Sequence, residues 1–306
     1  MTILITGGTG LVGSALSQAL IARRHDVIIL SRSAKSSTQP RLRYATWDVA
    51  VGTIDPDALA AADAIVHLAG AGVADKRWTP ARKQELVRSR VESGNLLVKA
   101  LGTMPNKVAT VVSASAIGWY GPDPQVPSGK PFVETDPADA SFLGRTCASW
   151  EAAIRPVQDL GKRLVITRIG IVLSRDGGAY AEFRKPMRFG VAPVLGSGNQ
   201  IVSWIHIDDL VELLITAVED RSYTGVYNAV APKPVSNRAL IEAIKKAKGG
   251  FHLPAPAPAF ALKVALGEMS VEVLKSTTVS SAKLQSKGFE FRYPTITEAA
   301  ANLERK

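Results

Sequence analysis

The chain has 306 residues, of which 46% are hydrophobic and 21% charged, and its 37 Lys and Arg exceed its 27 Asp and Glu to give a net charge of +10. This length and composition exclude a disordered or fibrous protein and allow one large α/β unit with a smaller lobe. The single cysteine, Cys147, excludes an internal disulfide and a multi-cysteine metal site, so we expect no metal and a reducing, cytoplasmic location.

The charge of +10 is compatible with three kinds of partner, namely nucleic acid, an anionic membrane and an anionic small molecule. The densest basic group spans 76–90, but it lies on or beside a helical pattern that Glu85 interrupts, as on a solvated helix face. There is no run of about 18 apolar residues that could cross a membrane. We therefore expect a small-molecule substrate and neither a nucleic-acid nor a membrane partner.

Short apolar runs alternate with helical patterns over the first 170 residues. The predicted strands are 2–6, 26–30, 43–48, 63–70, 107–115 and 163–170, and the predicted helices are 11–22, 80–101 and 142–160. Strands that are apolar on both faces and are joined by helices indicate a parallel sheet with helices on both sides. The pattern is typical of the doubly wound Rossmann fold.

This alternation breaks down after residue 170. We expect a strand at 201–207, a helix at 208–219, a strand at 225–230, an ordered proline-rich loop at 251–260, and helical segments around 260–275 and 295–304. The predicted organisation is a Rossmann domain over 1–170, to which segments of about 201–235 return. Most of 171–306, including the C-terminal helical segment 251–306, is then a smaller α/β lobe that binds substrate.

The sequence TILITGGTGLVGSAL carries the strongest motif. Gly7, Gly10 and Gly13 stand between an apolar strand and an apolar helix, which is the context that the dinucleotide-binding fingerprint requires. One glycine allows the tight turn, one lets backbone N–H groups approach a pyrophosphate, and one allows close packing of helix on strand. The helix N-terminus adds N–H donors and positive potential for phosphates.

The end of the second strand indicates which dinucleotide binds. An acidic residue there would bond the ribose 2′-hydroxyl of NAD, but the chain has Ser31 and Arg32. Because an arginine can bind a 2′-phosphate through two hydrogen bonds, NADP is favoured over NAD. Alternatively, Arg32 covers the adenine or faces water. Asp48, which ends the third strand, can bind the adenine amino group or cap its own strand.

Several further motifs carry a resemblance to a known family. ITGGTGLVG, HLAG at 67–70, VVSASAIGWYG at 111–121, ETDP at 134–137 and WIHIDD at 204–209 resemble the extended short-chain dehydrogenase/reductase family of nucleotide-sugar epimerases and dehydratases. ADKRWTPARKQ at 74–84, FLGRTCASWE at 142–151, HLPAPAPAFALKVALGEM and GFEFRYP are similar to its atypical subgroup, which has a C-terminal domain of unknown function. Extended members are often homodimers.

The resemblance implies that 67–70 end the fourth strand against the cofactor and that Ser113 and Ser115 end the fifth near the nicotinamide. It also implies that 168–170, at the end of the sixth strand, line the nicotinamide side. His67 is either a strand-end histidine bonded to backbone or a proton-transfer group. Together, the residues expected to contact the dinucleotide are Gly7, Thr9, Gly10, Leu11, Val12, Gly13, Ser31, Arg32, Asp48, Leu68, Ala69, Gly70, Ser113 and Ile169.

The resemblance also points to a missing pair of catalytic residues. Typical members use a tyrosine to transfer the substrate proton and a lysine four residues later to lower the tyrosine pKa. These positions fall at Leu143 and Cys147. Leucine has no proton to transfer, and Cys147 is interpreted as a buried structural thiol, although a thiolate nucleophile is the alternative.

If hydride transfer occurs, its acid or base must therefore come from another residue. Ser113, Ser115 and Tyr120, the last expected at the rim of the site, are the catalytic candidates, and Lys76, Arg77 and Glu134 are the substrate-binding candidates. The sequence favours an NADP-dependent oxidoreductase or epimerase-like enzyme that acts on a small polar or nucleotide-linked molecule. The alternatives are a non-catalytic NADP-binding sensor or regulatory module and, third, a nucleic-acid-binding protein.

Overall fold

Eight strands form the central sheet of the computed structural model, which describes residues 1–126 and 129–305. Their order is β12-β7-β6-β5-β1-β2-β3-β4, and every neighbouring pair is parallel except β3 with β4. The order reverses direction between β1 and β5, which is the switch point of a doubly wound sheet. The strands are β1 (Thr2–Thr6), β2 (Asp26–Ser31), β3 (Leu42–Asp48), β4 (Thr53–Ile54), β5 (Ala64–His67), β6 (Thr110–Ala116), β7 (Arg163–Ile169) and β12 (Gly225–Ala229).

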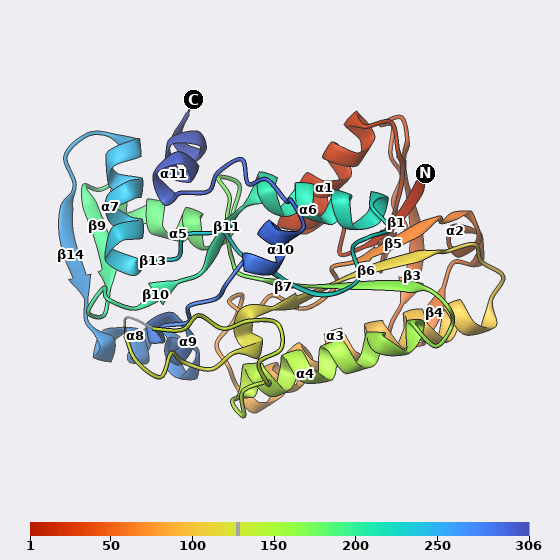
Figure 1. Cartoon of the computed structure of the whole chain (residues 1–306), viewed down its shortest axis with the longest axis horizontal. Coiled ribbons are helices and arrows are strands. Elements are labelled where there is room, and N and C mark those ends of the chain that lie inside the picture. Colours follow the sequence, from red (N-terminus) through yellow and green to blue (C-terminus); the bar gives the residue numbers. More distant parts are fainter. Residues whose placement is uncertain (127–128, 306) are drawn as a thin grey trace.

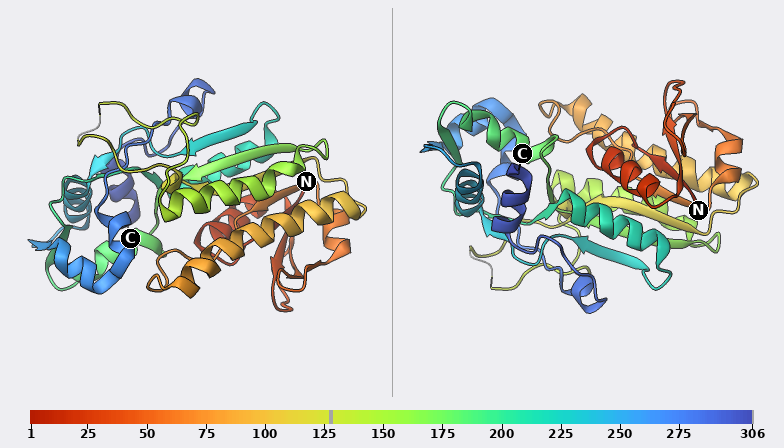
Figure 2. Two further views of the ribbon diagram at one scale, coloured as in Figure 1. Left: turned by 90° about the horizontal axis from the view of Figure 1, so that it is seen from below. Right: turned by 90° about the horizontal axis from the view of Figure 1, so that it is seen from above.

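Helices cover both faces of this sheet, and each face buries its own apolar core. Figure 1 shows α1 (Leu11–Ala22) and α6 (Ile207–Glu219) above the sheet, and α3 (Pro80–Thr103) and α4 (Phe142–Ile154) below it. The two views in Figure 2 show the members of each pair lying side by side. The expected fold class, a doubly wound α/β sheet with a smaller C-terminal α/β lobe, is confirmed.

The helix starts that border the site follow from local sequence signals. Thr79 caps α3 by accepting a hydrogen bond from the N–H of Arg82, and Pro80 occupies the first helical turn, where its missing N–H costs little. Ser141 caps α4 in the same way, through the N–H of Gly144 at 3.4 Å. A short helix, α2 (Pro56–Ala61), is capped by Asp55.

The smaller lobe combines three two-stranded sheets with helices α5 (Gly178–Met187), α7 (Asn237–Lys248) and α11 (Ile296–Glu304). Of the segment 201–235, only β12 joins the large sheet, and α6 packs on that sheet. The paired strands are β8 (Ile171–Leu173) with β11 (Trp204–His206), β9 (Val191–Leu195) with β14 (Leu253–Ala257), and β10 (Ile201–Val202) with β13 (Val235–Ser236).

The proline-rich segment 251–260 corrects one expectation. It is not a loop, because 253–257 form β14 in parallel with β9. The two prolines of β14 are Pro254 and Pro256, and among the described residues β14 has β9 as its only neighbouring strand. Proline is tolerated at such an edge, because the missing N–H faces away from the partner strand.

The C-terminal region is bonded to the loop that follows β6. The Asp123 carboxylate accepts hydrogen bonds from the hydroxyls of Ser276 and Thr278 at 2.9 and 2.7 Å and from the N–H of Thr278 at 2.8 Å. Backbone hydrogen bonds join Phe132 to Thr278 and Ser280. The short elements of these two regions are η1 (Ile117–Trp119), α8 (Ala259–Leu266), η3 (Gly267–Met269), α9 (Ser270–Leu274) and α10 (Ala282–Ser286), and a further short helix, η2 (Arg155–Val157), follows α4.

None of the helices within 1–126 and 129–305 combines the length and the apolar character that a membrane crossing requires.

Candidate functional site

The glycine loop between β1 and α1 is built around positions where a side chain cannot fit. Gly7 has φ +69°, and a Cβ there would lie 2.8 Å from the carbonyl oxygen of Leu68. A Cβ at Gly13 would overlap the carbonyl oxygen of Gly7, so the first turn of α1 lies directly against the loop. Gly10 is the N-cap of α1 and offers no side-chain cap. The first N–H groups of α1 can therefore bind an anion.

A pocket of about 490 Å³ opens beside this helix N-terminus. On its far side lies the turn after β8, where a Cβ at Gly177 would be 3.6 Å from Leu11. The smaller lobe thus closes over the start of α1. The pocket is lined by Thr9, Gly10, Leu11, Ser14, Ala15, Gln18, Ser174, Asp176 and Gly177.

His67 holds the end of β5 in place rather than facing a cavity. Its ring is fully buried, with Nδ1 2.7 Å from the Thr6 hydroxyl and Nε2 3.3 Å from the Ser93 hydroxyl. The Thr6 oxygen accepts the N–H groups of Leu68 and Ala69 at 3.1 and 3.2 Å, so its own hydrogen points to His67. Burial, with the charge of Arg90, lowers the His67 pKa to about 4. A neutral imidazole therefore shapes the turn that contacts Gly7.

The end of β2 carries the residues expected at the 2′-position of the ribose. Ser31 is half-buried and Arg32 is exposed. A hydrogen bond from Arg82 lowers the pKa of Glu85, and the positive charges of Lys76 and Arg32 act in the same direction. The charges of Lys76, which was expected to bind substrate, and of Arg32 therefore both act on the Glu85 carboxylate.

Asp48 takes the second of its two expected roles. Its carboxylate Oδ1 accepts the N–H groups of Ala50 and Val51 at 2.8 and 3.1 Å, and so it caps the turn after β3. This bonding leaves the other carboxylate oxygen for any further ligand.

Leu143, Cys147 and Glu151 lie on one face of α4, at a spacing of four residues. A Cβ at Gly118 would be 3.2 Å from Leu143 Cβ and 3.6 Å from Cys147 Sγ, so this face packs on the loop after β6. Burial, reinforced by the nearby charge of Glu151, raises the Cys147 pKa to about 12. At neutral pH the thiol is protonated and is a poor nucleophile.

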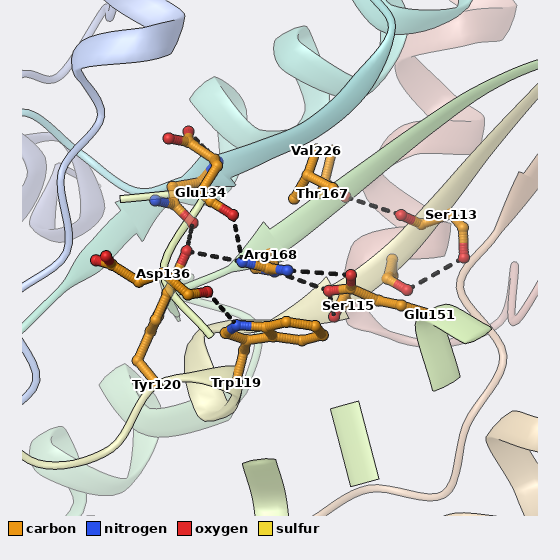
Figure 3. Close-up of polar contacts among 12 residues, drawn as sticks. Ser113, Ser115, Trp119, Tyr120, Glu134, Asp136, Glu151, Thr167, Arg168 and Val226 are labelled. Carbon is orange, nitrogen blue, oxygen red and sulfur yellow. Dashed lines mark hydrogen bonds and ion pairs between the residues drawn. The ribbon is translucent and has the colours of Figure 1, made fainter. Parts of the chain in front are cut away.

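Arg168, near the end of β7, is the centre of a buried polar network (Figure 3). Its Nε and Nη2 donate to Glu151 Oε1 and Oε2 at 2.8 and 3.1 Å, and its Nη1 donates to the Tyr120 hydroxyl at 3.0 Å. The guanidinium stacks on the ring of Trp119 at 3.6 Å. Arg168 is only 2% exposed and Glu151 1%, so the pair is removed from water.

The catalytic candidates from the sequence lie in or beside this network. Ser115 donates to Glu151 Oε1 at 2.9 Å, and Tyr120 donates to Asn228 Oδ1 at 2.7 Å. Tyr120 is fully buried and does not reach the rim, which differs from the expected position; burial raises the pKa of its phenol. Ser113 is buried as well, and its hydroxyl donates to the backbone of Ala114.

The substrate candidates Glu134 and Arg77 have different neighbours. Glu134 Oε1 accepts the backbone N–H of Asn228 at 2.9 Å, and its carbonyl oxygen accepts from Arg168. Arg77 lies against η3, where a Cβ at Gly267 would be 3.1 Å from Arg77 Nε. Lys76 lies in the same loop as Arg77, before α3, far in sequence from Glu134.

Sequence reasoning missed Glu151 and Asn228 as members of this site. The spacing gave a signal for Glu151, because it lies two helical turns after Leu143 on the same helix face. No local pattern marks Asn228, which reaches the network only because β12 pairs with β7.

The sheet order and the glycine loop define a Rossmann-type protein with the motif of dinucleotide binding. The chain belongs to the NAD dependent epimerase/dehydratase family, whose model matches residues 3–229. A domain of unknown function matches residues 257–303. The family resemblance drawn from the sequence is thereby confirmed.

Relatives of similar length support this assignment. An epimerase family protein of Staphylococcus saprophyticus is 36% identical over 301 residues, covering 98% of each chain. One of Mycobacterium tuberculosis is also 36% identical over 301 residues, covering 97% of this chain and 95% of that protein.

Solved structures share the whole fold. Human epimerase family protein SDR39U1, solved with NADPH, has a TM-score of 0.87 at 31% identity and covers 99% of each chain. UDP-glucuronic acid 4-epimerase of Bacillus cereus, solved with UDP-glucuronic acid and NAD, has a TM-score of 0.80 at 20% identity and 99% coverage of each, a likeness of fold alone. Both dinucleotides therefore occur on this fold.

Proposed function

We propose that this protein is an NADP-dependent oxidoreductase or epimerase-like enzyme that acts on a small polar or nucleotide-linked substrate. The glycine loop is the observation that carries the proposal, because the tight positions Gly7 and Gly13 and the uncapped Gly10 leave the N-terminus of α1 open to a pyrophosphate. In this proposal residues 1–170 bind the cofactor and most of 171–306 binds substrate, in a reducing, cytoplasmic compartment.

The preference for NADP rests on Arg32. Arg32 is exposed at the end of β2, where a guanidinium can bind the 2′-phosphate through two hydrogen bonds. The NADPH in the related human structure supports the same choice. Lys76, together with Arg77 and Glu134, is proposed to bind substrate.

The test of this preference is a binding titration followed by NADPH fluorescence. Removing one phosphate partner costs about 1.5 to 3 kcal/mol, so Arg32→Ala should weaken NADPH at least about tenfold and leave NADH within about twofold. Arg43→Ala, at an exposed arginine of β3, is the matched control. Equal affinity of the wild-type protein for NADH and NADPH would contradict the preference.

Proton transfer in the proposed enzyme needs a group other than the usual tyrosine and lysine. In the proposed alignment Leu143 and Cys147 stand where typical members have tyrosine and lysine, and neither can exchange a proton at neutral pH. Ser113 is the best remaining candidate, because its hydroxyl bonds only a neighbouring carbonyl and can rotate to a substrate oxygen. Ser115 and Tyr120 are proposed as positioning residues, because their hydroxyls are bonded to Glu151 and Asn228.

A second function, a non-catalytic NADP sensor, is favoured by that same bonding. The network holds three of the polar groups nearest the expected nicotinamide site in buried bonds to protein. Native mass spectrometry of the purified chain would identify a retained dinucleotide and any second ligand. NADPH oxidation with a carbonyl library separates the two functions: turnover abolished by Ser113→Ala supports the enzyme, and tight binding without turnover supports the sensor.

A further inference from the structure

The smaller lobe exposes two phenylalanines on neighbouring loops. Phe189 follows α5 and is 86% exposed, and Phe251 follows α7 and is 80% exposed. The N–H of Leu253 bonds the carbonyl oxygen of Gly190 at 2.8 Å, so the two loops run next to each other at the start of β9 and β14. Leu253 is itself 59% exposed. We call Phe189, Phe251 and Leu253 the aromatic tip; the strands β9 and β14, whose starts lie beside it, are at the left in Figure 1.

The topology explains why both aromatic residues reach the same edge. Helix α5 leads into β9 and helix α7 leads into β14, and these two strands are parallel. The C-terminal ends of both helices therefore lie beside the two strand starts. Each turn between helix and strand carries one phenylalanine outward, and the buried side of the lobe is filled by other residues such as Met187 and Ile244.

The same convergence gathers positive charge around the aromatic tip. Three carboxylates pair with three of the local cations, in the pairs Glu182 with Lys185, Glu242 with Lys245, and Glu304 with Arg184. Across 1–126 and 129–305, no carboxylate lies in ion-pair range of the remaining cations. These are Arg188, Lys246 and Lys248.

We propose that the aromatic tip and its three cations bind the surface of an anionic phospholipid membrane. Aromatic side chains suit the interface, because they bury apolar rings among the acyl chains at the headgroup boundary. Lysine and arginine beside them meet the negative lipid headgroups. The proposed contact is peripheral and reversible and needs no membrane-spanning helix.

The positive charges at the aromatic tip favour an anionic lipid surface over a second copy of the chain. A symmetric dimer through the tip would bring like charges from Arg188, Lys246 and Lys248 of each copy to one interface, which is unfavourable. An anionic lipid surface neutralises all three cations while it covers the rings. The tip belongs to the smaller lobe and includes none of the residues assigned to cofactor or substrate.

The test is co-sedimentation of the full-length protein with vesicles. Vesicles of phosphatidylcholine alone are compared with vesicles in which about one-third of the lipid is phosphatidylglycerol, at ionic strengths of about 0.05 and 0.5 M. We expect binding to the anionic vesicles at low salt, and at least about tenfold weaker binding at high salt or to phosphatidylcholine alone. Far-UV circular dichroism and thermal unfolding check that each variant is folded.

Matched variants test whether vesicle binding depends on the aromatic tip or on any exposed phenylalanine or lysine. Phe189→Ser combined with Phe251→Ser should weaken binding at least about tenfold. Phe260→Ser should leave it unchanged, because Phe260 is 71% exposed but lies beyond the other end of β14. Lys246→Glu should weaken binding at least about fivefold, whereas Lys99→Glu, on an exposed position of α3, should not.

Three results would overturn the proposal. The wild-type protein could remain in the supernatant with anionic vesicles at low salt, or Phe260→Ser could lose as much binding as the double variant. Analytical ultracentrifugation could also reveal a dimer that the double variant dissociates and that does not sediment with vesicles. The covering partner would then be a second copy of the chain.

Discussion

Arg168 and Glu151 form a two-pronged ion pair, with Nε–Oε1 at 2.8 Å and Nη2–Oε2 at 3.1 Å, between β7 and α4. A pair this buried gains little over apolar residues of similar volume, because both charges lose their hydration. Removing one partner leaves the other as an uncompensated buried charge. The pair therefore links β7 to α4, because moving either element away would leave a buried charge without its partner.

The first prediction concerns this dependence. Arg168→Met or Glu151→Leu alone should lower the free energy of unfolding by about 3 to 5 kcal/mol, and the double variant should recover most of that loss. Urea unfolding measures all three. Arg155→Ala is the control, since exposed Arg155 lies 3.2 Å from Glu151 and should cost at most about 1 kcal/mol. Additive losses in the double variant would show that the two side chains are not coupled.

The second prediction concerns pH and His67. Its pKa is about 4 in the folded protein against an ordinary 6.5, so the folded state binds a proton less readily than the unfolded chain. The stability that this provides is present above pH 6.5 and is lost as the pH falls toward 4. We expect the wild-type protein to lose up to about 3 kcal/mol more over this range than His67→Gln, measured by urea unfolding. Parallel curves would mean that His67 protonates freely in the fold.

The third prediction concerns Cys147, whose pKa is raised to about 12. The folded state disfavours the thiolate, so the associated stability is complete below the ordinary pKa of about 9 and declines as pH rises above it. At pH 10 the wild-type protein should have lost about 1.4 kcal/mol more than Cys147→Ala, relative to pH 8. A thiol reagent should modify Cys147 slowly in native protein and rapidly in urea, and rapid native modification would contradict its burial.

The fourth prediction concerns the glycine loop. Gly13→Ala places a methyl group against the backbone of Gly7, which cannot move away as a side chain can, so dinucleotide affinity should fall at least about tenfold. Gly102→Ala is the control in α3, because its Cβ would meet only Leu160 at 3.5 Å. That control should keep cofactor affinity and gain up to about 1 kcal/mol in stability. Isothermal titration with NADPH measures the affinities.

The sequence predicted the sheet and its glycine loop because both are encoded locally. Strands such as 2–6 and 163–169 are rich in Ile, Leu and Val and largely buried, and the turn at Gly7 needs a residue that tolerates positive φ. The prediction of a loop for the proline-rich segment was wrong because it also used local pattern alone. Prolines argue against a strand unless the strand lies at an edge, and edge position is a property of the whole fold.

The buried network could not be predicted in the same way. Tyr120 reads as a loop residue, and only the packing of Asn228 and Arg168 around it shows that its hydroxyl is enclosed. Glu151 reads as a surface position of a helix, since carboxylates are seldom buried without a partner. Its partner lies on β7 and comes from a different part of the sequence. Contacts of this kind depend on tertiary structure rather than on local pattern.

The hydrogen bonds that Ser276 and Thr278 donate to the Asp123 carboxylate connect the two matched sequence regions. The two matched sequence regions end and begin at 229 and 257, which suggests a modular boundary. A chain cut there would leave the Asp123 carboxylate buried without its donors, and Asn228 would lose its bond to Ser280. We therefore expect the two regions to unfold together, because truncation at this boundary would remove hydrogen-bond partners from the loop after β6.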